Sequence, residues 1–387
     1  MTSQIGIPKG AITSIGDMLD HCAKVQPGQD ILILAELDGL YGGDSLVDQE
    51  AISWIQSAVQ ARGANASILW IDEPAKPHAW RFPPVLKAAM LGCTTLINHS
   101  LNLVTEEMTE FREYIAEHKI RMVRNFASTA PLLCTAWAQT PYELVSEIRY
   151  QSAIPFKGGK PWIITDDNGT HLEGTILDPF HTPGVPGASA YVARREESGY
   201  YLPWPEWVHP PIKLANTSGT FIFDCMLSWW SRYIGISPYF SKPIQLTVKN
   251  NRITDIKGGN EANALRKFLD SMRERLGEGV YDFNTLHFGV HPQAMVAPHQ
   301  CPHVLTRRTI EHSHSSNIHV HIGAPPAIPS YPYWMHITGD IRTATFKVGD
   351  TIIHDHGYLK ALDHPAVKAT AAKYPGRPGL EQEPRSF

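Results

Sequence analysis

Residues 30–35 read Asp-Ile-Leu-Ile-Leu-Ala, a short apolar run typical of a buried strand. A helical stripe of apolar residues follows over 48–61 and ends at Gly63, and a second strand is expected over 66–71. The alternation then repeats, with helices expected over 84–91 and 105–118 and strands over 94–97 and 120–123. Strand–helix–strand units at this spacing predict a parallel sheet covered on both faces, and hence a Rossmann-like α/β domain over 1–158.

The pattern changes after about residue 160, where β-branched residues, prolines and glycines become frequent. Alternating runs separated by turn residues predict hairpins, and one amphipathic helix is expected over 261–276. We therefore expect a second, C-terminal domain over 159–375 that is mixed, strand-rich and metal-binding. A tail rich in Pro, Arg and Glu is expected over 376–387.

The composition narrows the class of protein. The chain has 387 residues, 43% of them hydrophobic and 19% charged, and a net charge of -4. This balance gives no electrostatic reason to expect a nucleic acid or an anionic membrane as partner. No apolar run is long enough to span a bilayer and no secretory signal is evident at the start. The five cysteines are scattered, which favours free thiols and a cytoplasmic location.

Histidine is concentrated in the second half: 11 of the 19 histidines lie between residues 287 and 356. Three apolar runs that read as strands carry His287, the pair His319 and His321, and His336. A buried imidazole needs partners for its ring nitrogens, and a neutral imidazole is a common metal ligand. Because strand side chains alternate, His319 and His321 should face one side. We predict a metal site, with satisfied core histidines as the alternative.

Other histidines have less specific surroundings. His312 and His314 lie in a polar stretch and are expected in a solvated loop, while His354 and His356 are expected in a surface turn. His99 follows the third predicted strand. Ligands usually bind at the carboxyl ends of parallel strands, so His99 could act as an acid or base, or it could be an ordinary loop residue.

Several segments resemble a known superfamily, the thermophilic metallo-aminopeptidases and their relatives. These are Leu-Pro-Trp-Pro-Glu at 202–206, Leu-His-Phe-Gly-Val-His-Pro at 286–292, Ile-His-Val-His-Ile-Gly at 318–323 and Met-His-Ile-Thr-Gly-Asp at 335–340, with 217–224 between them. The peptidase branch places a glutamate where this chain has His287. The 2,5-dihydroxypyridine 5,6-dioxygenase branch places a histidine there, so the chain resembles that branch more.

The resemblance implies a ligand set. His287 and His336 would bind the metal, and the aspartate ligand of the dioxygenases falls on Thr338, a poor neutral ligand. Glu206 or His319 could supply the missing ligand. Asp340 is on the correct face of its strand but about 7 Å further along, so we do not expect it to bind.

The resemblance also implies an activity. We expect a mononuclear Fe(II) dioxygenase, with Mn or Zn as alternative metals, that uses O2 to open the ring of a small hydroxylated aromatic or N-heterocycle. His99 would take the hydroxyl proton of this aromatic substrate, and His319 or His321 would hydrogen-bond bound oxygen. The relatives suggest a homo-oligomer. An aminopeptidase-like metallohydrolase and a small-molecule binder that has lost its metal remain as alternatives.

Overall fold

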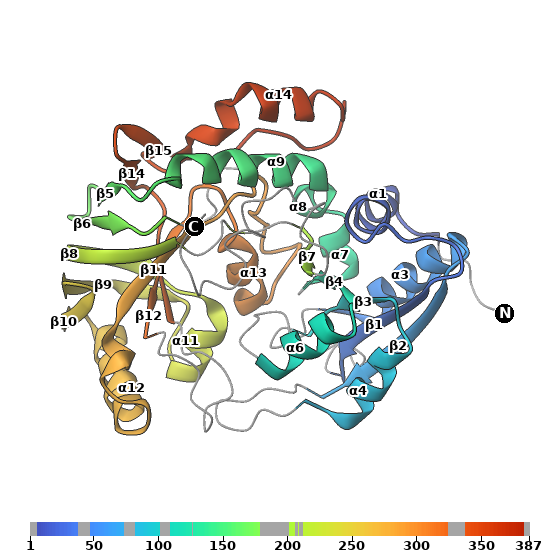
Figure 1. Ribbon diagram of the computed structural model, residues 1–387, viewed down its shortest axis with the longest axis horizontal. Coiled ribbons are helices and arrows are strands. Elements are labelled where there is room, and N and C mark those ends of the chain that lie inside the picture. The colour runs from blue at the N-terminus through green and yellow to red at the C-terminus, as the bar shows by residue number, and fades with distance from the viewer. Residues whose placement is uncertain are drawn as a thin grey trace.

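Two β-sheets with helices around and between them form the molecule (Figure 1). The computed structural model describes residues 6–37, 47–72, 82–100, 109–125, 127–178, 201–205, 208, 212–323 and 337–382. The N-terminal sheet is parallel, as the sequence predicted, and the strand-rich C-terminal part forms an antiparallel sheet. Within the described residues, no helix combines the length and the apolar character needed to cross a membrane.

The N-terminal sheet has five strands in the part of the chain that is described, in the order β2-β1-β3-β4-β7. Its strands are β1 (Asp30–Glu36), β2 (Asn65–Ile71), β3 (Thr95–Asn98), β4 (Arg121–Arg124) and β7 (Tyr201–Pro203). The helices of this half are α1 (Lys9–Asp17), the π-helix Met18–Cys22, α3 (Gln49–Ala61), α4 (Pro84–Leu91), α6 (Thr109–Glu117), α7 (Ala130–Leu133) and α8 (Ala136–Gln139). The predicted βα alternation over the first 124 residues is confirmed.

Local chemistry explains where these elements begin. The carboxylate of Asp48 accepts a hydrogen bond of 2.7 Å from the Ala51 backbone amide and so caps the first turn of α3. Strand β1 lies between β2 and β3 and is buried along Ile31–Ala35, which is why it reads as an unbroken apolar run. Strand β7 comes from beyond residue 200 and pairs with β4, so the chain returns to the first sheet after entering the second.

The C-terminal sheet is antiparallel and has 11 strands among the described residues. Its main path runs β11-β12-β13-β8-β6-β5-β14-β15-β16, and β9 joins β8 to β10 at the side. The bounds are β5 (Pro161–Thr165), β6 (His171–Ile176), β8 (Ile212–Cys225), β9 (Tyr239–Lys249), β10 (Arg252–Lys257), β11 (Phe283–Phe288), β12 (Ile318–Ile322), β13 (Ile337–Ile341), β14 (Thr345–Val348), β15 (Thr351–Asp355) and β16 (Tyr358–Leu359). The expected hairpins are present, β5 with β6 and β9 with β10.

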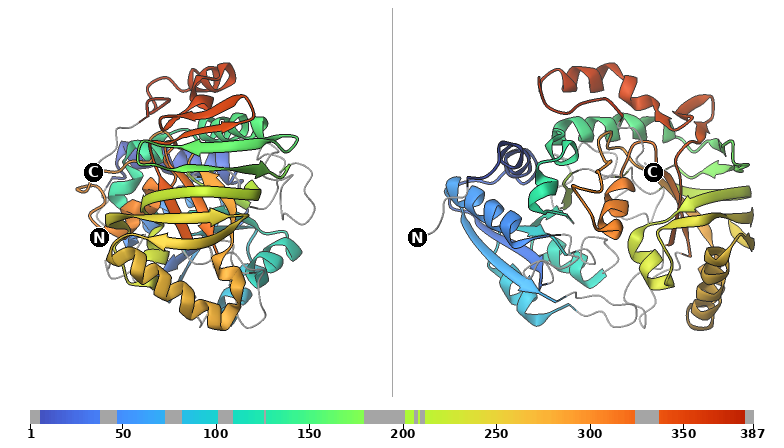
Figure 2. Two further views of the ribbon diagram at one scale, coloured as in Figure 1. Left: turned by 90° about the vertical axis from the view of Figure 1, so that its left-hand side faces the viewer. Right: turned by 180° about the vertical axis from the view of Figure 1, so that it is seen from behind.

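Helices surround this second sheet. They are α9 (Tyr142–Ala153), α11 (Ser228–Ile234), α12 (Asn260–Leu276), α13 (Val304–Glu311) and α14 (Pro365–Ala371), with short 3-10 turns at Ile154–Phe156, Glu278–Tyr281 and Lys360–Asp363. The predicted helix over 261–276 is α12. Helix α13 lies between the two sheets (Figures 1 and 2). It therefore stands against the face of β12 and β13 that looks into the molecule.

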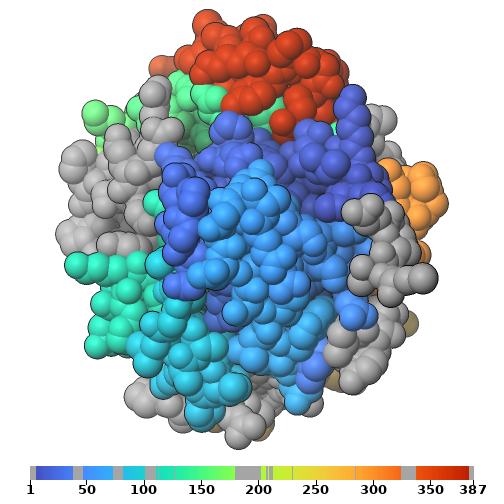
Figure 3. Space-filling view, turned by 90° about the vertical axis from the view of Figure 1, so that its right-hand side faces the viewer, coloured from blue at the N-terminus to red at the C-terminus, as the bar shows by residue number. Residues whose placement is uncertain are grey.

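The C-terminal segment folds back onto the N-terminal half. Lys373 and Tyr374 bond to the Glu143 carboxylate, and Arg377 donates to the Gln139 carbonyl at 2.7 Å. Arg377 also lies 3.5 Å from the carboxylate of the buried Asp17 in α1. Figure 3 shows this red segment resting on the dark blue N-terminal helices. The domain boundaries expected from the sequence remain predictions.

Candidate metal centre

Histidines meet on three neighbouring strands of the large sheet. Strand β12 lies between β11 and β13, and the pairing places His287 directly opposite His319. On the other side, His319 pairs with Asp340 and His321 pairs with Thr338. Residues that are directly opposite share a face of an antiparallel sheet, and so do residues two apart in one strand. All five side chains therefore belong to one face, as alternation predicted for each strand.

A three-histidine group forms on β11 and β12. The rings of His287 and His319 stack with centroids 5.0 Å apart, and the rings of His287 and His321 lie 4.3 Å apart. One ligand nitrogen from each of the three residues lies within 4.8 Å of the other two. His319 is 1% exposed and His287 is 7% exposed, while His321 is half-buried. The group thus runs from the interior toward a partly open side.

A second group lies deeper and shares His319. Its members are His312, His319 and Asp340, again with ligand atoms within 4.8 Å of one another. The rings of His312 and His319 have centroids 3.9 Å apart. Asp340 is fully buried, and its Oδ2 accepts hydrogen bonds from His312 Nδ1 at 2.8 Å, from Asn317 Nδ2 at 2.9 Å and from the guanidinium of Arg308. This carboxylate is therefore already matched by a buried cation.

The electrostatic surroundings set the charge of these groups. Burial lowers the pKa of His319 well below its usual value, and the neighbouring His312, His287 and His321 lower it further. His319 is consequently neutral at physiological pH, with a lone pair free for a ligand. Burial alone would raise the pKa of Asp340, but His312 and Arg308, together with the hydrogen bonds from His312 and Asn317, lower it to about 2. Asp340 is consequently ionised.

Two buried ligand atoms could bind a metal ion without breaking a hydrogen bond. His319 Nδ1 and Asp340 Oδ1 have no hydrogen-bond partner among the described residues. Leaving such an atom without a partner costs about 1 to 3 kcal/mol, so each usually has a functional or structural reason. An imidazole nitrogen and a carboxylate oxygen are both ligands that a transition metal accepts.

The three-histidine group fits a metal ion better than the second group does. Ligand nitrogens lie about 2 Å from a bound ion, so three of them around one ion are about 3 to 4 Å apart. One ligand nitrogen each from His287, His319 and His321 lies within 4.8 Å of the other two, which is close to this spacing. In the second group, by contrast, a cation beside Asp340 would face the guanidinium of Arg308.

The structure brings together only some of the residues that the sequence predicted for the metal site. His287, His319 and His321 lie together in the three-histidine group. Thr338 lies across from His321, and its Oγ1 accepts a hydrogen bond of 2.9 Å from the Leu227 amide. His336 and Glu206 fall outside the described residues. The assignment of metal ligands therefore stays a prediction.

His99 lies in the other half of the molecule, directly after β3 at its carboxyl end. It is fully buried, and neither ring nitrogen has a hydrogen-bond partner among the described residues. Burial lowers the pKa of His99 to about 3, so the ring is neutral with one nitrogen able to accept a proton. His99 belongs to neither of the two histidine groups.

The expectation for His312 was wrong, and so was that for His314. Both were expected in a solvated loop, yet His312 is 3% exposed and His314 is fully buried. Helix α13 ends at Glu311 and carries this stretch into the interior, where Asp340 and Ser316 hydrogen-bond the rings. The surface turn expected for His354 is also wrong, because His354 is buried and bonds to the Ser315 carbonyl.

Arg308 and Asn317 were not predicted as site residues, and Asp340 was not expected to bind. One signal was available, since Arg308 and His312 are four residues apart and so lie on one face of a helical turn. The partner that joins them, Asp340, is about thirty residues away, and that contact depends on how α13 packs on β13.

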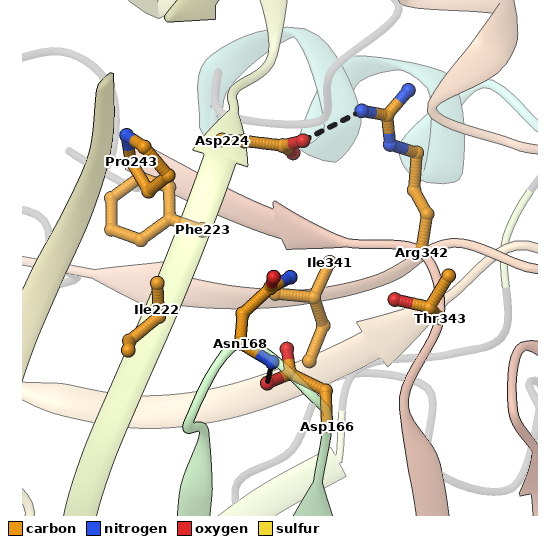
Figure 4. A pocket seen from close by; sticks show the side chains of 9 residues that line it. All are labelled: Asp166, Asn168, Ile222, Phe223, Asp224, Pro243, Ile341, Arg342 and Thr343. Atoms are coloured by element: carbon orange, nitrogen blue, oxygen red, sulfur yellow. Dashed lines mark hydrogen bonds and ion pairs between the residues drawn. The ribbon is translucent and has the colours of Figure 1, made fainter.

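A separate pocket of about 140 Å³ lies at the β5–β6 turn and the ends of β8 and β13 (Figure 4). Arg342 and Asp224 form an ion pair of 2.8 Å at its edge, and Asp166 and Asn168 line the side formed by the turn. None of the residues of the two histidine groups lines this pocket. It is therefore distinct from the candidate metal centre, and Arg342 and Asp224 at its edge already pair with each other.

Comparison with known proteins supports the resemblance. Residues 231–309 match the family model of NicX, described as 2,5-dihydroxypyridine 5,6-dioxygenase, and this segment contains His287. No curated protein sequence matches the chain. Over these residues the sequence thus resembles the NicX family, as expected.

Two solved structures share the fold. One is 2,5-dihydroxypyridine dioxygenase from Pseudomonas putida KT2440, with a TM-score of 0.61 and 14% identity over 92% of this chain and 98% of that one. The other is wild-type AmpT from Thermus thermophilus, with a TM-score of 0.51 and 11% identity over 91% of this chain and 99% of that one. The arrangement of the two sheets is therefore that of NicX and of AmpT.

Proposed function

We propose that this protein is a metal-dependent dioxygenase that opens the ring of a small hydroxylated aromatic or N-heterocyclic compound related to 2,5-dihydroxypyridine. The observation that carries the proposal is the position of His287. It lies within the segment that matches the NicX family model, and it joins His319 and His321 in a group of three ligand nitrogens. Fold and local chemistry thus support the same class of enzyme.

The metal would be held by His287, His319 and His321, with His336 or Glu206 as a further ligand. Iron(II) is the expected ion, and Mn and Zn are alternatives. Such an ion, when bound, brings the substrate oxygen and O2 together and stabilises the charge that develops. The half-buried side of the group at His321 leaves a direction from which a substrate can approach. The hydrogen bond from the Leu227 amide holds Thr338 in place across from this residue.

His99 would receive the hydroxyl proton of the substrate. A neutral imidazole with an unused nitrogen is able to accept a proton, and a developing negative charge on the substrate oxygen would stabilise the imidazolium that results. Without such a charge, burial keeps the His99 ring neutral. His99 would thus gain its proton only when substrate is present.

Two measurements on the purified protein test the proposal. Metal analysis should find one ion per chain, and oxygen uptake with 2,5-dihydroxypyridine or a related dihydroxylated ring should depend on that ion. The fold shared with AmpT makes an aminopeptidase the second candidate. Two ions per chain with release of amino acids from peptides would favour it, and absence of any bound metal would contradict both functions.

A further inference from the structure

We infer that Asp340 is a positioning residue of the metal centre, and that in the metal-loaded protein its Oδ1 accepts a hydrogen bond from Nδ1 of His319. His319 then binds the metal through Nε2. The inference rests on the proposed function and concerns the orientation of one ligand. A histidine that binds a metal usually donates its other ring N–H to a carboxylate or a carbonyl, and this bond fixes the tautomer and the direction of the ring.

His319 and Asp340 each contain one buried atom that has no hydrogen-bond partner among the described residues. These atoms are Nδ1 of the imidazole and Oδ1 of the carboxylate. An ionised carboxylate only accepts hydrogen bonds, whereas an imidazole nitrogen that carries a proton donates one. The two atoms are therefore complementary, and a bond between them removes the cost of leaving both without a partner.

The pairing of β12 with β13 brings these two side chains together. His319 and Asp340 are directly opposite each other in this antiparallel pair, so both lie on the face that carries the histidine groups. Residues in this relation have Cβ atoms about 4.5 to 5.5 Å apart. One ligand atom of His319 also lies within 4.8 Å of one of Asp340. The inferred bond therefore requires rotation of side chains and no change in strand register.

The other carboxylate oxygen of Asp340 is already committed. Oδ2 accepts hydrogen bonds from His312, Asn317 and Arg308. These three donors come from α13 and the segment that follows it, and they hold the carboxylate from one side. His312 also contacts the ring of His319, with centroids 3.9 Å apart. Oδ1 is thus the oxygen that Asp340 has left for His319.

The inferred bond determines which nitrogen of His319 binds the metal. A neutral imidazole carries a proton on one nitrogen and a lone pair on the other. If Nδ1 donates to Asp340, the lone pair is on Nε2, and Nε2 is the ligand. The competing arrangement is a metal bound at Nδ1, which would leave Oδ1 of Asp340 without this donor.

Proton NMR of the cobalt(II)-loaded protein tests the inference. The unpaired electrons of cobalt(II) move the N–H resonance of a bound imidazole far from the other protein resonances. An N–H that donates to a buried carboxylate exchanges slowly with water. The spectrum of the unmodified protein in H2O should therefore contain a shifted N–H resonance that exchanges slowly and belongs to His319.

Asp340→Asn should shift or abolish this resonance. The three donors at Oδ2 would hold the amide oxygen there, which leaves the amide NH2 facing Nδ1 of His319, so that two donors meet. Cobalt(II) affinity should fall by about tenfold or more, as for other residues that orient a metal ligand. Asn317→Ala is the matched control, because it removes a donor to Oδ2 and leaves Oδ1 in place. It should retain the resonance and bind cobalt(II) within about threefold of the unmodified protein.

The possible results separate the inference from the proposed function. If Asp340→Asn matches Asn317→Ala in both resonance and affinity, the inference is wrong and the proposed function stands. The same holds if the unmodified protein binds cobalt(II) without a slowly exchanging shifted N–H. Failure of the unmodified protein to bind cobalt(II) would contradict both. If Asp340→Asn does not fold, the double variant with Arg308→Met removes the two buried charges together. A retained His319 resonance in that variant would also overturn the inference.

Discussion

The two histidine groups of the large sheet use similar side chains in opposite ways. In the group of His287, His319 and His321, three imidazoles stack without a counter-charge inside the group. In the deeper group, Asp340 is ionised and joined to Arg308, His312 and Asn317. The first group contains no carboxylate, and in the second group the charge of Asp340 is matched by Arg308. Residue type alone therefore does not identify a metal site. The hydrogen bonds and ion pairs of each ligand atom also decide whether it can bind a metal.

One residue, His319, connects the two groups. His319 lies in both groups, with His287 on one side and Asp340 on the other. Outer carboxylates commonly orient the histidines that bind a metal, and their loss weakens metal binding. In this structure the contact is made through His312, which bonds to Asp340 and whose ring lies 3.9 Å from the ring of His319.

The largest effect is expected from removing Arg308. Arg308→Met leaves the ionised Asp340 without its buried cation, and breaking a buried pair in this way costs about 3 to 5 kcal/mol of folding free energy. Urea unfolding of the metal-free protein measures this loss. The double variant Arg308→Met with Asp340→Asn is the control and should recover part of the stability. A loss below about 1 kcal/mol for the single variant would mean that the pair is not buried as described.

Removal of His287 should affect the metal more than the fold. His287→Ala deletes one ligand of the three-histidine group, so metal affinity should fall by about a hundredfold or more. The free energy of unfolding of the metal-free protein should change by only about 1 kcal/mol, a typical value for one substitution. Titration with cobalt(II) or iron(II) and urea unfolding measure the two quantities. Unchanged metal content in this variant is the result that contradicts the ligand assignment.

Acid should weaken the deeper group through Asp340. The pKa of Asp340 is about 2 in the folded protein, below the value of about 3.9 for a free aspartate. A carboxylate with a lowered pKa stabilises the fold above its unfolded pKa, and this contribution is lost as the pH falls from about 4 toward 2. Linkage makes the contribution about 2.6 kcal/mol. Urea unfolding between pH 6 and pH 2 measures it, and Asp340→Asn should remove this part of the acid dependence.

The smallest effect is expected at a histidine outside both groups. His356 is 75% exposed and its ring bonds to the carboxylate of its neighbour Asp355. His356→Ala should change the free energy of unfolding by no more than about 0.5 kcal/mol and leave metal content unaltered. A change in metal binding in this variant would show that histidines act on the metal from outside the two groups.

Much of the fold could be predicted from local patterns. The run Asp30–Ala35, the helix after Asp48 and the helix α12 all have periodicities that a single element explains, and each formed where expected. The short helix α13 was not predicted, because five of its eight residues are polar and most of these become buried only by packing on the sheet. The same packing buries His312, which was expected in a solvated loop.

The sequence by itself determined which residues share a face within each strand, because side-chain alternation is a property of the extended backbone. It thus determined that His319 and His321 point together, and that Thr338 and Asp340 do so as well. Only the tertiary structure decided that β11, β12 and β13 are neighbours in this register, which placed His287 beside His319 and Asp340 behind it. Strand register and helix packing depend on contacts between residues far apart in the chain. No local sequence pattern therefore indicates that Arg308 lies beside Asp340.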